Sequence, residues 1–453
     1  MAIRRVLIAN RGEIAVRIIH ACEALGIETV LAVSAVDRDT MAARIADQAF
    51  CIGAAKATDS YLNPNKMVAA ALATGCDALH PGYGFLAESA DLAQLCMDNG
   101  ITFVGPRPDQ IRTMGNKLSA RTLARRLDIP ILPGSEKVMS AEEAVFLGRH
   151  LKLPIMLKAA AGGGGRGMMI VHSLCDLVPA FQKVQSESAA AFGDGSIYME
   201  RFIANARHVE VQILGDSHGN VIHLGERDCS LQRRHQKMVE EAPAPNLPEA
   251  LRSDLRSAAV RLAEGFGYEN AGTVEFIVDQ DDDTYFFLEM NTRIQVEHPV
   301  TEMISGIDLI EEQFRVAAGE RLGFRQEDIL LRGHAIECRI NAELPEANFR
   351  PSPGCITGWK PPQGPNIRLD SHCHAGYVVP VNYDSMLGKL IVYGPDRDTA
   401  ISRMQRALAR FRIEGIPTTL EFQATLINNP DFAAGTMNTT LVDNLLKLPG
   451  SGV

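Results

Sequence analysis

The feature that most constrains the fold is a strand–helix–strand pattern at the start of the chain. Val6–Ala9 is a short apolar run, Ile14–Leu25 has apolar residues at helical spacing, and Thr29–Val33 is a second apolar run. Asn10–Glu13 connects the first run to the helix, and Gly26 ends the helix. Two strands joined by a helix at this spacing lie parallel in one sheet. The pattern therefore predicts an N-terminal α/β domain with a doubly wound parallel sheet.

The same alternation continues through the first hundred residues. Further helices and strands are predicted at Asn65–Thr74, Ala78–His80, Ala90–Asn99 and Ile101–Val104. No GxGxxG sequence follows the first strand, so this domain is not predicted to bind a dinucleotide. Tyr83 and Glu88 follow the strand that ends at His80. They lie where the strand ends of such a sheet form a crevice, at positions where either a ligand contact or a structural role fits.

A glycine-rich segment lies between two predicted strands, Leu153–Lys158 and Met168–Val171. Its spacing formally satisfies GxGxxG, but a strand follows it instead of a helix, and no GK[ST] sequence is present. A glycine hairpin can close over a triphosphate because its bare backbone N–H groups approach phosphate oxygens closely. Lys158 at the strand end and Lys117 upstream would supply cations. A flexible surface hairpin is the alternative.

The stretch Glu289–His298 combines two acids, two amides and one guanidinium. Written as an extended strand it places five polar side chains on one face: Glu289, Asn291, Arg293, Gln295 and Glu297. The preceding hairpin would set Glu275 beside Glu289, with Asn291 two residues further on. Such oxygen donors near phosphates suit Mg²⁺, and without a cation the two carboxylates would repel and raise at least one pKa. A half-exposed strand with a solvated polar face is the alternative.

Three segments in the middle of the chain carry further candidates. Ile197–Ile203 is predicted to be an exposed edge strand whose backbone could meet an adenine. His208–Leu214 alternates polar and apolar residues, as a strand with one polar face does. The segment Glu226–Lys237 is predicted to be a cationic loop, with the basic residues Arg227, Arg233, Arg234, His235 and Lys237. In a chain that is acidic elsewhere, an anion site is favoured over a solvated run of charges.

Composition excludes several classes of function. The chain has a net charge of −10, which argues against nonspecific binding to nucleic acid or to anionic membrane surfaces. Its nine cysteines include no CxxC pair, which suits a reducing compartment, and the cytoplasm is the expected location. No transmembrane segment or secretory leader is predicted. His372–His374 contains two imidazoles without a second cluster, so a metal site is not favoured there.

Taken together, the longer motifs resemble those of the ATP-grasp ligases, and most closely the biotin carboxylase family. The motifs are Ile8–Ala15, His80–Phe85, Lys158 with the glycine loop, Glu226–Pro245, Glu289–Glu302 and Tyr383–Met386. The resemblance covers essentially the whole chain. It implies an N-terminal α/β domain (1–113), an ATP-grasp domain (114–330) with a mobile glycine-loop lid at about 131–203, and a C-terminal α/β domain (331–453).

The resemblance also implies roles for individual residues. The ATP phosphates would be held by Lys117, Lys158, Gly164 and Gly165, and the adenine by Glu200, Arg201, Phe202 and Ile203. Further nucleotide contacts would come from His208, Gln232 and His235, and the Mg²⁺ (or Mn²⁺) ligands would be Glu275, Glu289 and Asn291. Bicarbonate would be bound by Lys237, Arg293, Gln295 and the Val296 backbone N–H. Glu297 would be the general base, Arg339 would meet the biotin ureido oxygen, and Tyr83 would lie near biotin.

Small departures from the family pattern occur at three positions. Arg201 stands where lysine is frequent, Ala206 where proline is common and Ala161 where some members have glycine. Because of Arg201, a lysine-specific contact to the adenine base is in doubt. Because of Ala161, the entrance of the lid would be less flexible. The backbone contacts at Arg201 should survive, and neither Ala206 nor Ala161 is expected to take part in the chemistry.

The reaction implied by the resemblance uses ATP to activate bicarbonate. Carboxyphosphate would form, release CO₂ in a closed site, and leave a phosphate that takes the biotin N1′ proton. The implied partners are a biotin carboxyl carrier protein and carboxyltransferase subunits, and the implied assembly is a homodimer. No biotin-attachment motif is found, so the carrier is expected to be a separate chain.

The final acceptor and two broader alternatives stay open. Acetyl-CoA carboxylase, and hence fatty acid synthesis, is the expected setting, with propionyl-CoA, pyruvate and urea carboxylases as alternatives. Another ATP-grasp ligase would keep the ATP half of the site and change the acceptor. An inactive nucleotide-sensing subunit is disfavoured because Glu275, Glu289 and Glu297 are all present.

Overall fold

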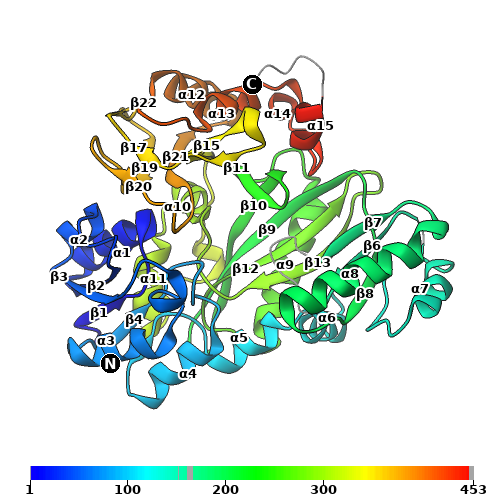
Figure 1. Ribbon diagram of the computed structural model, residues 1–453, viewed down its shortest axis with the longest axis horizontal. Helices are drawn as coiled ribbons and strands as arrows, with labels where there is room; N and C mark the ends of the chain where they lie inside the picture. Colours follow the sequence, from blue (N-terminus) through cyan, green and yellow to red (C-terminus); the bar gives the residue numbers. More distant parts are fainter. Residues whose placement is uncertain (1, 152, 161–166, 448–453) are drawn as a thin grey trace.

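A computed structural model describes residues 2–151, 153–160 and 167–447 of the chain (Figure 1). The predicted mixed α/β class is confirmed, with a parallel sheet in the N-terminal part and antiparallel sheets after it. Gly164 and Gly165, the predicted phosphate-binding glycines, lie outside the described residues. Within the described ranges, no helix has the length and apolar character needed to cross a membrane.

The N-terminal domain has a five-stranded parallel sheet, drawn in blue in Figure 1, with the strand order β3-β2-β1-β4-β5. Its elements are β1 (Arg5–Ile8), α1 (Gly12–Leu25), β2 (Glu28–Ser34), α2 (Met41–Ile45), β3 (Gln48–Gly53), α3 (Pro64–Ala73), β4 (Ala78–His80), α4 (Ala90–Asp98) and β5 (Thr102–Phe103). Gly26 ends α1 in the left-handed conformation (φ 70°), where its N–H bonds the last-turn carbonyls. The predicted strand–helix–strand unit is therefore confirmed.

A smaller unit lies at the opposite end of the molecule from the N-terminal domain (Figure 1). Its three-stranded sheet has the order β7-β6-β8 and two helices pack with it. The elements are α7 (Ala141–Gly148), β6 (Ile155–Ala159), β7 (Met168–Val171), α8 (Leu177–Phe192) and β8 (Ile197–Arg201). Two helices, α5 (Pro108–Gly115) and α6 (Lys117–Arg126), connect the N-terminal domain to this unit.

One eight-stranded antiparallel sheet runs through the middle of the chain and into its C-terminal part. Its order is β13-β12-β9-β10-β11-β14-β21-β19. The strands are β9 (Ala206–Gly215), β10 (Val221–Arg233), β11 (Gln236–Ala242), β12 (Asn270–Asp279), β13 (Thr284–Asn291), β14 (His334–Asn341), β19 (Ile367–Ser371) and β21 (Met386–Gly394). Because β11 pairs with β14, Glu240 lies opposite Glu337, and Arg339 lies opposite Lys389 on the next strand. The sheet thus joins functional candidates from distant parts of the sequence.

Helices cover this sheet and bury its apolar side chains. Leu255, Ala258 and Leu262 of α9 pack with Val209, Val211 and Val274 of the sheet, and all six are fully buried. The remaining helices are α9 (Glu249–Glu264), α10 (His298–Ser305), α11 (Leu309–Ala317), α12 (Arg397–Arg410), α13 (Leu420–Ile427), α14 (Pro430–Ala434) and α15 (Leu441–Lys447). Short strand pairs complete the C-terminal part: β15 (Glu343–Leu344) with β16 (Arg350–Pro351), β17 (Gly354–Cys355) with β20 (Val378–Val379), and β18 (Gly358–Lys360) with β22 (Arg412–Glu414).

One strand prediction and one loop prediction are wrong in part. The extended reading of Glu289–His298 holds only to Asn291, where β13 ends; residues 292–297 form a loop, and α10 begins at His298. The Glu226–Lys237 segment is not a loop, because it forms most of β10, a tight turn and the start of β11. The turn residues Arg234 and His235 have φ values of 47° and 65°. Hairpin turns with positive φ usually carry Asn or Gly, so the sequence contained no turn signal here.

The prediction of an exposed strand at Ile197–Ile203 is also wrong. Ile197–Glu200 of β8 is buried, because Gly134 and Val138 bridge to the outer side of this edge strand. All of β9 is buried, including its polar face with His208, Glu210 and Gln212. Polar side chains can be buried in this way only if they are paired, and the pairs define the candidate site.

Candidate active site

Two acidic side chains face each other across the β12–β13 hairpin, as the sequence predicts. Glu275 lies directly opposite Glu289, and Asn291 Nδ2 donates to Glu275 Oε1 over 2.8 Å. The Glu289 side chain is 39% exposed, and Lys117 Nζ lies 3.9 Å from Glu289 Oε2. Burial and then the charge of Glu275 raise the pKa of Glu289 above its ordinary value. The predicted like-charge pair with one raised pKa is therefore confirmed.

The donor set on this hairpin fits a hard divalent cation. Two carboxylates lie side by side there, and the amide oxygen of Asn291, which accepts from Arg293, is two residues further on. A bound cation would relieve the repulsion between the two carboxylates. A second group, His208, Glu210 and Glu275, has ligand atoms within 4.8 Å of one another. Lys237 already donates to two of these residues, so this group is neutralised by the protein itself.

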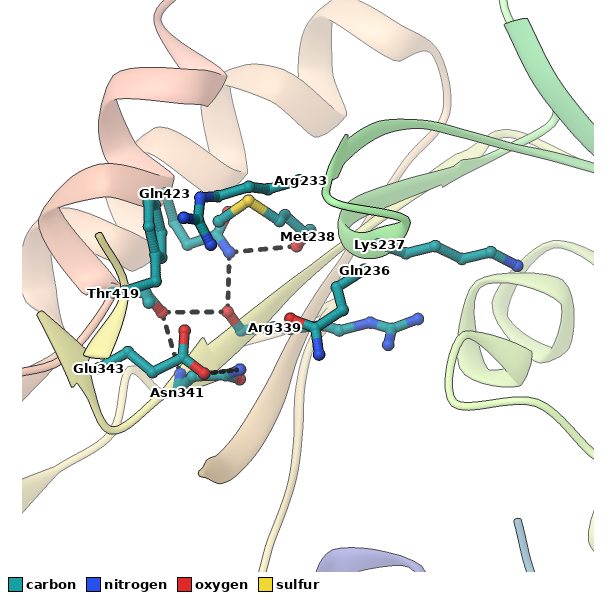
Figure 2. Close-up of a pocket in the computed structure, with 10 residues that line it drawn as sticks. Arg233, Gln236, Lys237, Met238, Arg339, Asn341, Glu343, Thr419 and Gln423 are labelled. Atoms are coloured by element: carbon teal, nitrogen blue, oxygen red, sulfur yellow. Dashed lines mark hydrogen bonds between the residues drawn. The ribbon is translucent and has the colours of Figure 1, made fainter. Parts of the chain in front are cut away.

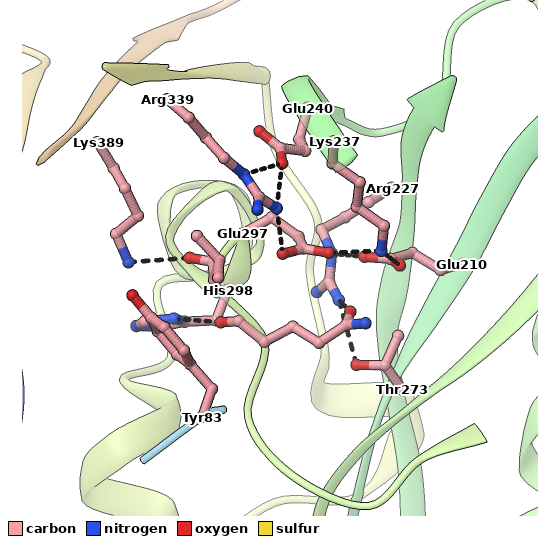
Figure 3. Close-up of polar contacts among 12 residues, drawn as sticks. Tyr83, Glu210, Arg227, Lys237, Glu240, Thr273, Glu297, His298, Arg339 and Lys389 are labelled. Carbon is pink, nitrogen blue, oxygen red and sulfur yellow. Dashed lines mark hydrogen bonds and ion pairs between the residues drawn. The ribbon is translucent and has the colours of Figure 1, made fainter. Parts of the chain in front are cut away.

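Lys237 is the centre of the buried charge cluster (Figure 3). Its Nζ lies 2.6 Å from Glu210 Oε2, 3.0 Å from Glu275 Oε1 and 2.7 Å from Glu297 Oε1. Burial alone would lower the pKa of Lys237, but the three carboxylates raise it well above its ordinary value. Lys237 therefore carries a positive charge at the point where three carboxylates, from β9, β12 and the loop before α10, meet.

Glu297 is held by a cation on each carboxylate oxygen. Lys237 donates to Oε1, and Arg339 NH2 donates to Oε2 over 2.9 Å. Burial would raise the pKa of Glu297, but Lys237 and then Arg339 lower it below its ordinary value. Arg339 Nε also donates to Glu240 Oε1 over 2.6 Å, and burial raises the pKa of Glu240 to about 7. Glu297 is thus a buried carboxylate with a cation beside each of its oxygens.

Figure 2 shows the Lys237 and Arg339 side chains extending to the same side from the neighbouring strands β11 and β14. Behind them, Gln423 Nε2 donates to the carbonyl oxygens of Met238 over 3.1 Å and of Arg339 over 2.7 Å. This amide is fully buried and connects both strands to α13. The relative placement of the two cations is therefore fixed by the C-terminal part of the fold.

The loop after β13 brings Arg293 and Gln295 to the same cluster. Arg293 NH2 donates to Asn291 Oδ1 over 2.9 Å, and its Nε lies 3.1 Å from a carboxylate oxygen of Glu88. Gln295 Nε2 donates to Glu275 Oε1 over 2.7 Å. Val296 is half-buried beside them. The structure thus brings all predicted bicarbonate residues to one place.

Arg227 does not belong to an anion site, contrary to the prediction. It is fully buried and its five protein acceptors use its whole guanidinium group: Glu210, Gln212, Thr273, Gln295 and Thr301. Arg233 is also tied to protein atoms, at Asn348 and over the ring of Phe349. Lys237 pairs with all three carboxylates of the acidic cluster, whereas Arg227 pairs with Glu210 from the buried side.

Most residues that are predicted to bind the nucleotide lie on β6, β8, β9 and β10 or directly after these strands. Lys158 Nζ lies 2.5 Å from Glu200 Oε2, and Arg121 bonds the other oxygen of that carboxylate. His208 Nε2 lies 3.0 Å from Glu275 Oε2. The remaining predicted residues are placed by β8 and its extension (Arg201, Phe202, Ile203), by the end of β10 (Gln232) and by the β10–β11 turn (His235). Arg201, which stands in place of a frequent lysine, pairs with Asp279 over 3.1 Å.

Tyr83 lies across the cluster, in the N-terminal domain. Its hydroxyl donates to Glu13 in a short hydrogen bond and contacts Met386 Sδ over 3.9 Å. It lines a cavity of about 250 Å³ between the N-terminal domain and the 382–386 segment. A contact between Tyr83 and biotin stays a prediction.

Several residues of the cluster were not predicted from the sequence. They are Glu13, Glu210, Glu240, His298 and Lys389, which pair with the predicted residues or with their backbone. The alternation of polar and apolar residues in β9 places Glu210 on the polar face of the strand. The alternation does not indicate which residue Glu210 pairs with. Glu13, Glu240 and Lys389 pair with residues of other elements, so their partners could not be found locally; His298 bonds the Gln295 carbonyl three residues before it, a contact that depends on the loop conformation.

Comparisons with known proteins agree along the whole chain. Residues 2–111 match the family described as biotin carboxylase, N-terminal domain, residues 116–325 the carbamoyl-phosphate synthase L chain, ATP binding domain, and residues 337–444 the biotin carboxylase C-terminal domain. A biotin carboxylase of Nostoc sp. is 51% identical over 448 residues, which are 99% of this chain and 100% of that protein.

Two solved structures have the same architecture. A Campylobacter jejuni biotin carboxylase complex with βγ-ATP has a TM-score of 0.95 and 47% identity, and the match covers 98% of this chain and 99% of that chain. The biotin carboxylase domain dimer of Hydrogenobacter thermophilus 2-oxoglutarate carboxylase, in complex with MgADP, ADP and bicarbonate, has a TM-score of 0.94 and 44% identity over 98% of both chains. With matches of this extent in sequence and in structure, the chain belongs to the biotin carboxylase family of ATP-dependent ligases.

Proposed function

We propose that this enzyme carboxylates biotin on a biotin carboxyl carrier protein, using ATP and bicarbonate and giving N1′-carboxybiotin, ADP and phosphate. The observation that carries the proposal is the buried Glu297 side chain, with Lys237 on one carboxylate oxygen and Arg339 on the other. A carboxylate in this setting can accept a proton from a bound acid while fixed cations hold the resulting anion. Bicarbonate is such an acid.

In the proposed reaction, bicarbonate lies between Lys237, Arg293, Gln295 and the Val296 N–H. Bound bicarbonate would accept hydrogen bonds from Lys237 that Glu297 accepts without it. Because Lys237 would then stabilise the Glu297 carboxylate less, the pKa of Glu297 would rise and Glu297 would become a stronger base. Glu297 takes the bicarbonate proton, and the carbonate oxygen attacks the γ-phosphoryl group, giving carboxyphosphate and ADP. Carboxyphosphate breaks down to CO₂ and phosphate, and phosphate takes the biotin N1′ proton. Arg339 stabilises the ureido oxyanion that captures CO₂.

ATP would lie along β8 and the β10–β11 turn, with Lys117 and Lys158 on its phosphates. Glu275, Glu289 and Asn291 would hold Mg²⁺ or Mn²⁺, which neutralises phosphate charge when bound. Lys158 is paired with Glu200, which holds its charge in place. These assignments complete a site in which the protein mainly positions reactants and stabilises charge.

We further propose that the enzyme serves an acetyl-CoA carboxylase, together with carboxyltransferase subunits and as a homodimer. The three-domain division at 1–113, 114–330 and 331–453 is the proposed organisation. Propionyl-CoA, pyruvate and urea carboxylases use closely similar parts, and one structural relative is part of a 2-oxoglutarate carboxylase. The final acceptor is decided by testing which carrier protein is carboxylated.

The proposed function is tested by measuring ADP release with Mg²⁺, with and without bicarbonate and free biotin. We expect biotin to stimulate ADP release strongly and the stimulation to require bicarbonate. Bicarbonate-dependent ADP release that ignores biotin would instead assign the acceptor to another ligase reaction. Absence of ADP release from a protein that binds ATP, with biotin and with the carrier protein alike, would favour a regulatory role.

The change Arg339→Ala should separate the two half-reactions. Because Arg339 is assigned to the ureido oxyanion, we expect biotin-dependent carboxylation to fall by about 100-fold or more, as for a lost oxyanion donor. ADP release without biotin should fall less, since Lys237 still holds Glu297. Both rates are measured on the same preparation. Equal losses in both would contradict the role of Arg339 in the biotin step.

The change Glu289→Gln should separate metal binding from stability. It removes the repulsion between Glu289 and Glu275, so we expect the unfolding midpoint of the free protein to stay the same or to rise. The additional stabilisation by Mg-ADP should be lost, because a metal ligand is missing. Thermal unfolding with ADP, with and without Mg²⁺, checks both. The exposed Asp283→Asn change removes the same charge in the hairpin turn and should leave the Mg-ADP effect intact.

A further inference from the structure

The loop between β13 and α10 contains a backbone donor without a protein acceptor. Val296 is half-buried, and in the described part of the chain its N–H has no hydrogen-bond partner. The carbonyl groups on both sides are bonded: the Gln295 oxygen accepts from His298 Nδ1 over 2.8 Å, and the Val296 oxygen accepts from Lys389 Nζ over 2.8 Å. An open N–H between two bonded carbonyls is an arrangement that a ligand would complete.

His298 is built to hold the first of these carbonyls. It is fully buried, and its Nε2 has no partner among the described atoms. Since a carbonyl oxygen can only accept, the proton of the neutral ring lies on Nδ1. In a trans peptide the C=O and N–H groups point in opposite directions. Fixing the Gln295 oxygen toward His298 therefore directs the Val296 N–H away from it, and the backbone N–H of His298 supports the same oxygen at 3.3 Å.

Lys389 holds the second carbonyl and is itself fixed from two sides. It lies on β21 opposite Arg339 and is fully buried. Its Nζ is 3.1 Å from Glu13 Oε1, which also accepts from Tyr83, and 3.8 Å from Asp370 Oδ2. The ammonium that bonds the Val296 carbonyl is thus anchored by the N-terminal domain as well as by the C-terminal sheet.

We propose that His298 and Lys389 are positioning residues that hold the two peptide planes around Val296 and so aim its N–H at bicarbonate. The proposal rests on the proposed function. Neither residue touches the substrate, and both act through the backbone of the loop that also carries Glu297. A donor fixed before the substrate arrives needs no reorganisation during the reaction, which is the physical basis of such pre-oriented N–H groups. Binding of ATP, which lies on other elements, should depend on them much less.

The matched variants His298→Asn and His298→Leu test the first half. The amide nitrogen of Asn can occupy the place of Nδ1 and donate to the same carbonyl, whereas Leu has a comparable apolar volume and cannot donate. We expect His298→Leu to lower kcat/KM for bicarbonate about tenfold or more, within the effect known for a lost oxyanion donor. KM for ATP should change less than about twofold, and His298→Asn should restore most of the loss. Equal loss in both variants, or equal effects on ATP and bicarbonate, would overturn the proposal.

The Lys389 contact gives a second test that does not depend on the folding of His298→Leu. Lys389→Met alone would leave the Glu13 carboxylate buried and unpaired, so Lys389→Met is combined with Glu13→Gln. We expect the double variant to lose kcat/KM for bicarbonate selectively, and Glu13→Gln alone to lose less. An unchanged kcat/KM for bicarbonate in the folded double variant would exclude the role of Lys389. The unmodified enzyme is the control, and it must show bicarbonate-dependent ADP release. If the unmodified enzyme shows no such release, the proposed function itself is wrong.

Discussion

Replacing Glu297 by Gln should lower the rate of bicarbonate-dependent ADP release by about 10²–10⁴, the range expected for loss of a general base. The amide has the same size but cannot take the bicarbonate proton. The fold should persist, because Lys237 keeps Glu210 and Glu275, and Arg339 keeps Glu240. ATP binding, measured by equilibrium titration, should change little. A variant that turns over at the unmodified rate would show that Glu297 is not the base.

The pH dependence provides an independent check on the same residue. Lys237 and Arg339 outweigh the effect of burial and hold the pKa of Glu297 below its ordinary value. The profile of kcat/KM for bicarbonate reports groups of the free enzyme. Because its pKa is below the ordinary value, Glu297 is ionised throughout the range from about pH 5 to 8. If kcat/KM falls toward acid pH within that range, the fall should therefore reflect protonation of another group. The exposed Glu327→Gln variant is a control for the loss of one negative charge.

The second large effect is expected for Arg227→Met, which should destabilise the protein by about 3–5 kcal/mol. Arg227 is fully buried, and its Nε donates to Glu210 Oε1 over 2.6 Å. Met fills a similar volume but leaves the acceptor oxygens of Gln212 and Gln295 unpaired as well. Denaturant unfolding measures the loss, and a change below about 1 kcal/mol would contradict the structural role of this residue.

Two controls separate the buried charge from other effects of the Arg227 change. In the double variant with Glu210→Gln, the unpaired carboxylate is gone, so the combined loss should be smaller than the sum of the single losses. The change Arg325→Met removes the same charge at a site that is 81% exposed and should leave the unfolding midpoint unchanged. A strictly additive double variant would mean that Arg227 does not stabilise Glu210.

Arg227 also illustrates where sequence reasoning failed. Five basic residues within one short segment of an acidic chain indicated an anion site, and one of them, Lys237, does join the candidate bicarbonate site. Arg227 lies on the same hairpin but points into the packed interior between β9, β12 and α10, where five acceptors bond it. Burial and partner choice depend on neighbouring elements, and a charge count along one segment contains neither.

The sequence by itself determined the parallel N-terminal sheet, the Glu275–Glu289 pair and the family resemblance. The first two depend on local periodicity and on a short hairpin, in which residues close in sequence meet in space. The limits of local reasoning are visible at Glu289–His298, where the strand ends at Asn291 because the chain turns to form α10.

Only the tertiary structure decided how the charges are paired. Arg339 meets Glu240 across 99 sequence positions, and Lys389 meets the Val296 carbonyl across 93, because β14 and β21 extend the same sheet that carries Lys237. An ion pair or hydrogen bond requires contact within a few ångströms, and contact between distant strands follows from sheet order and register. For that reason the sequence could name Glu297, Lys237 and Arg339, whereas the network that orients them became visible only in the folded chain.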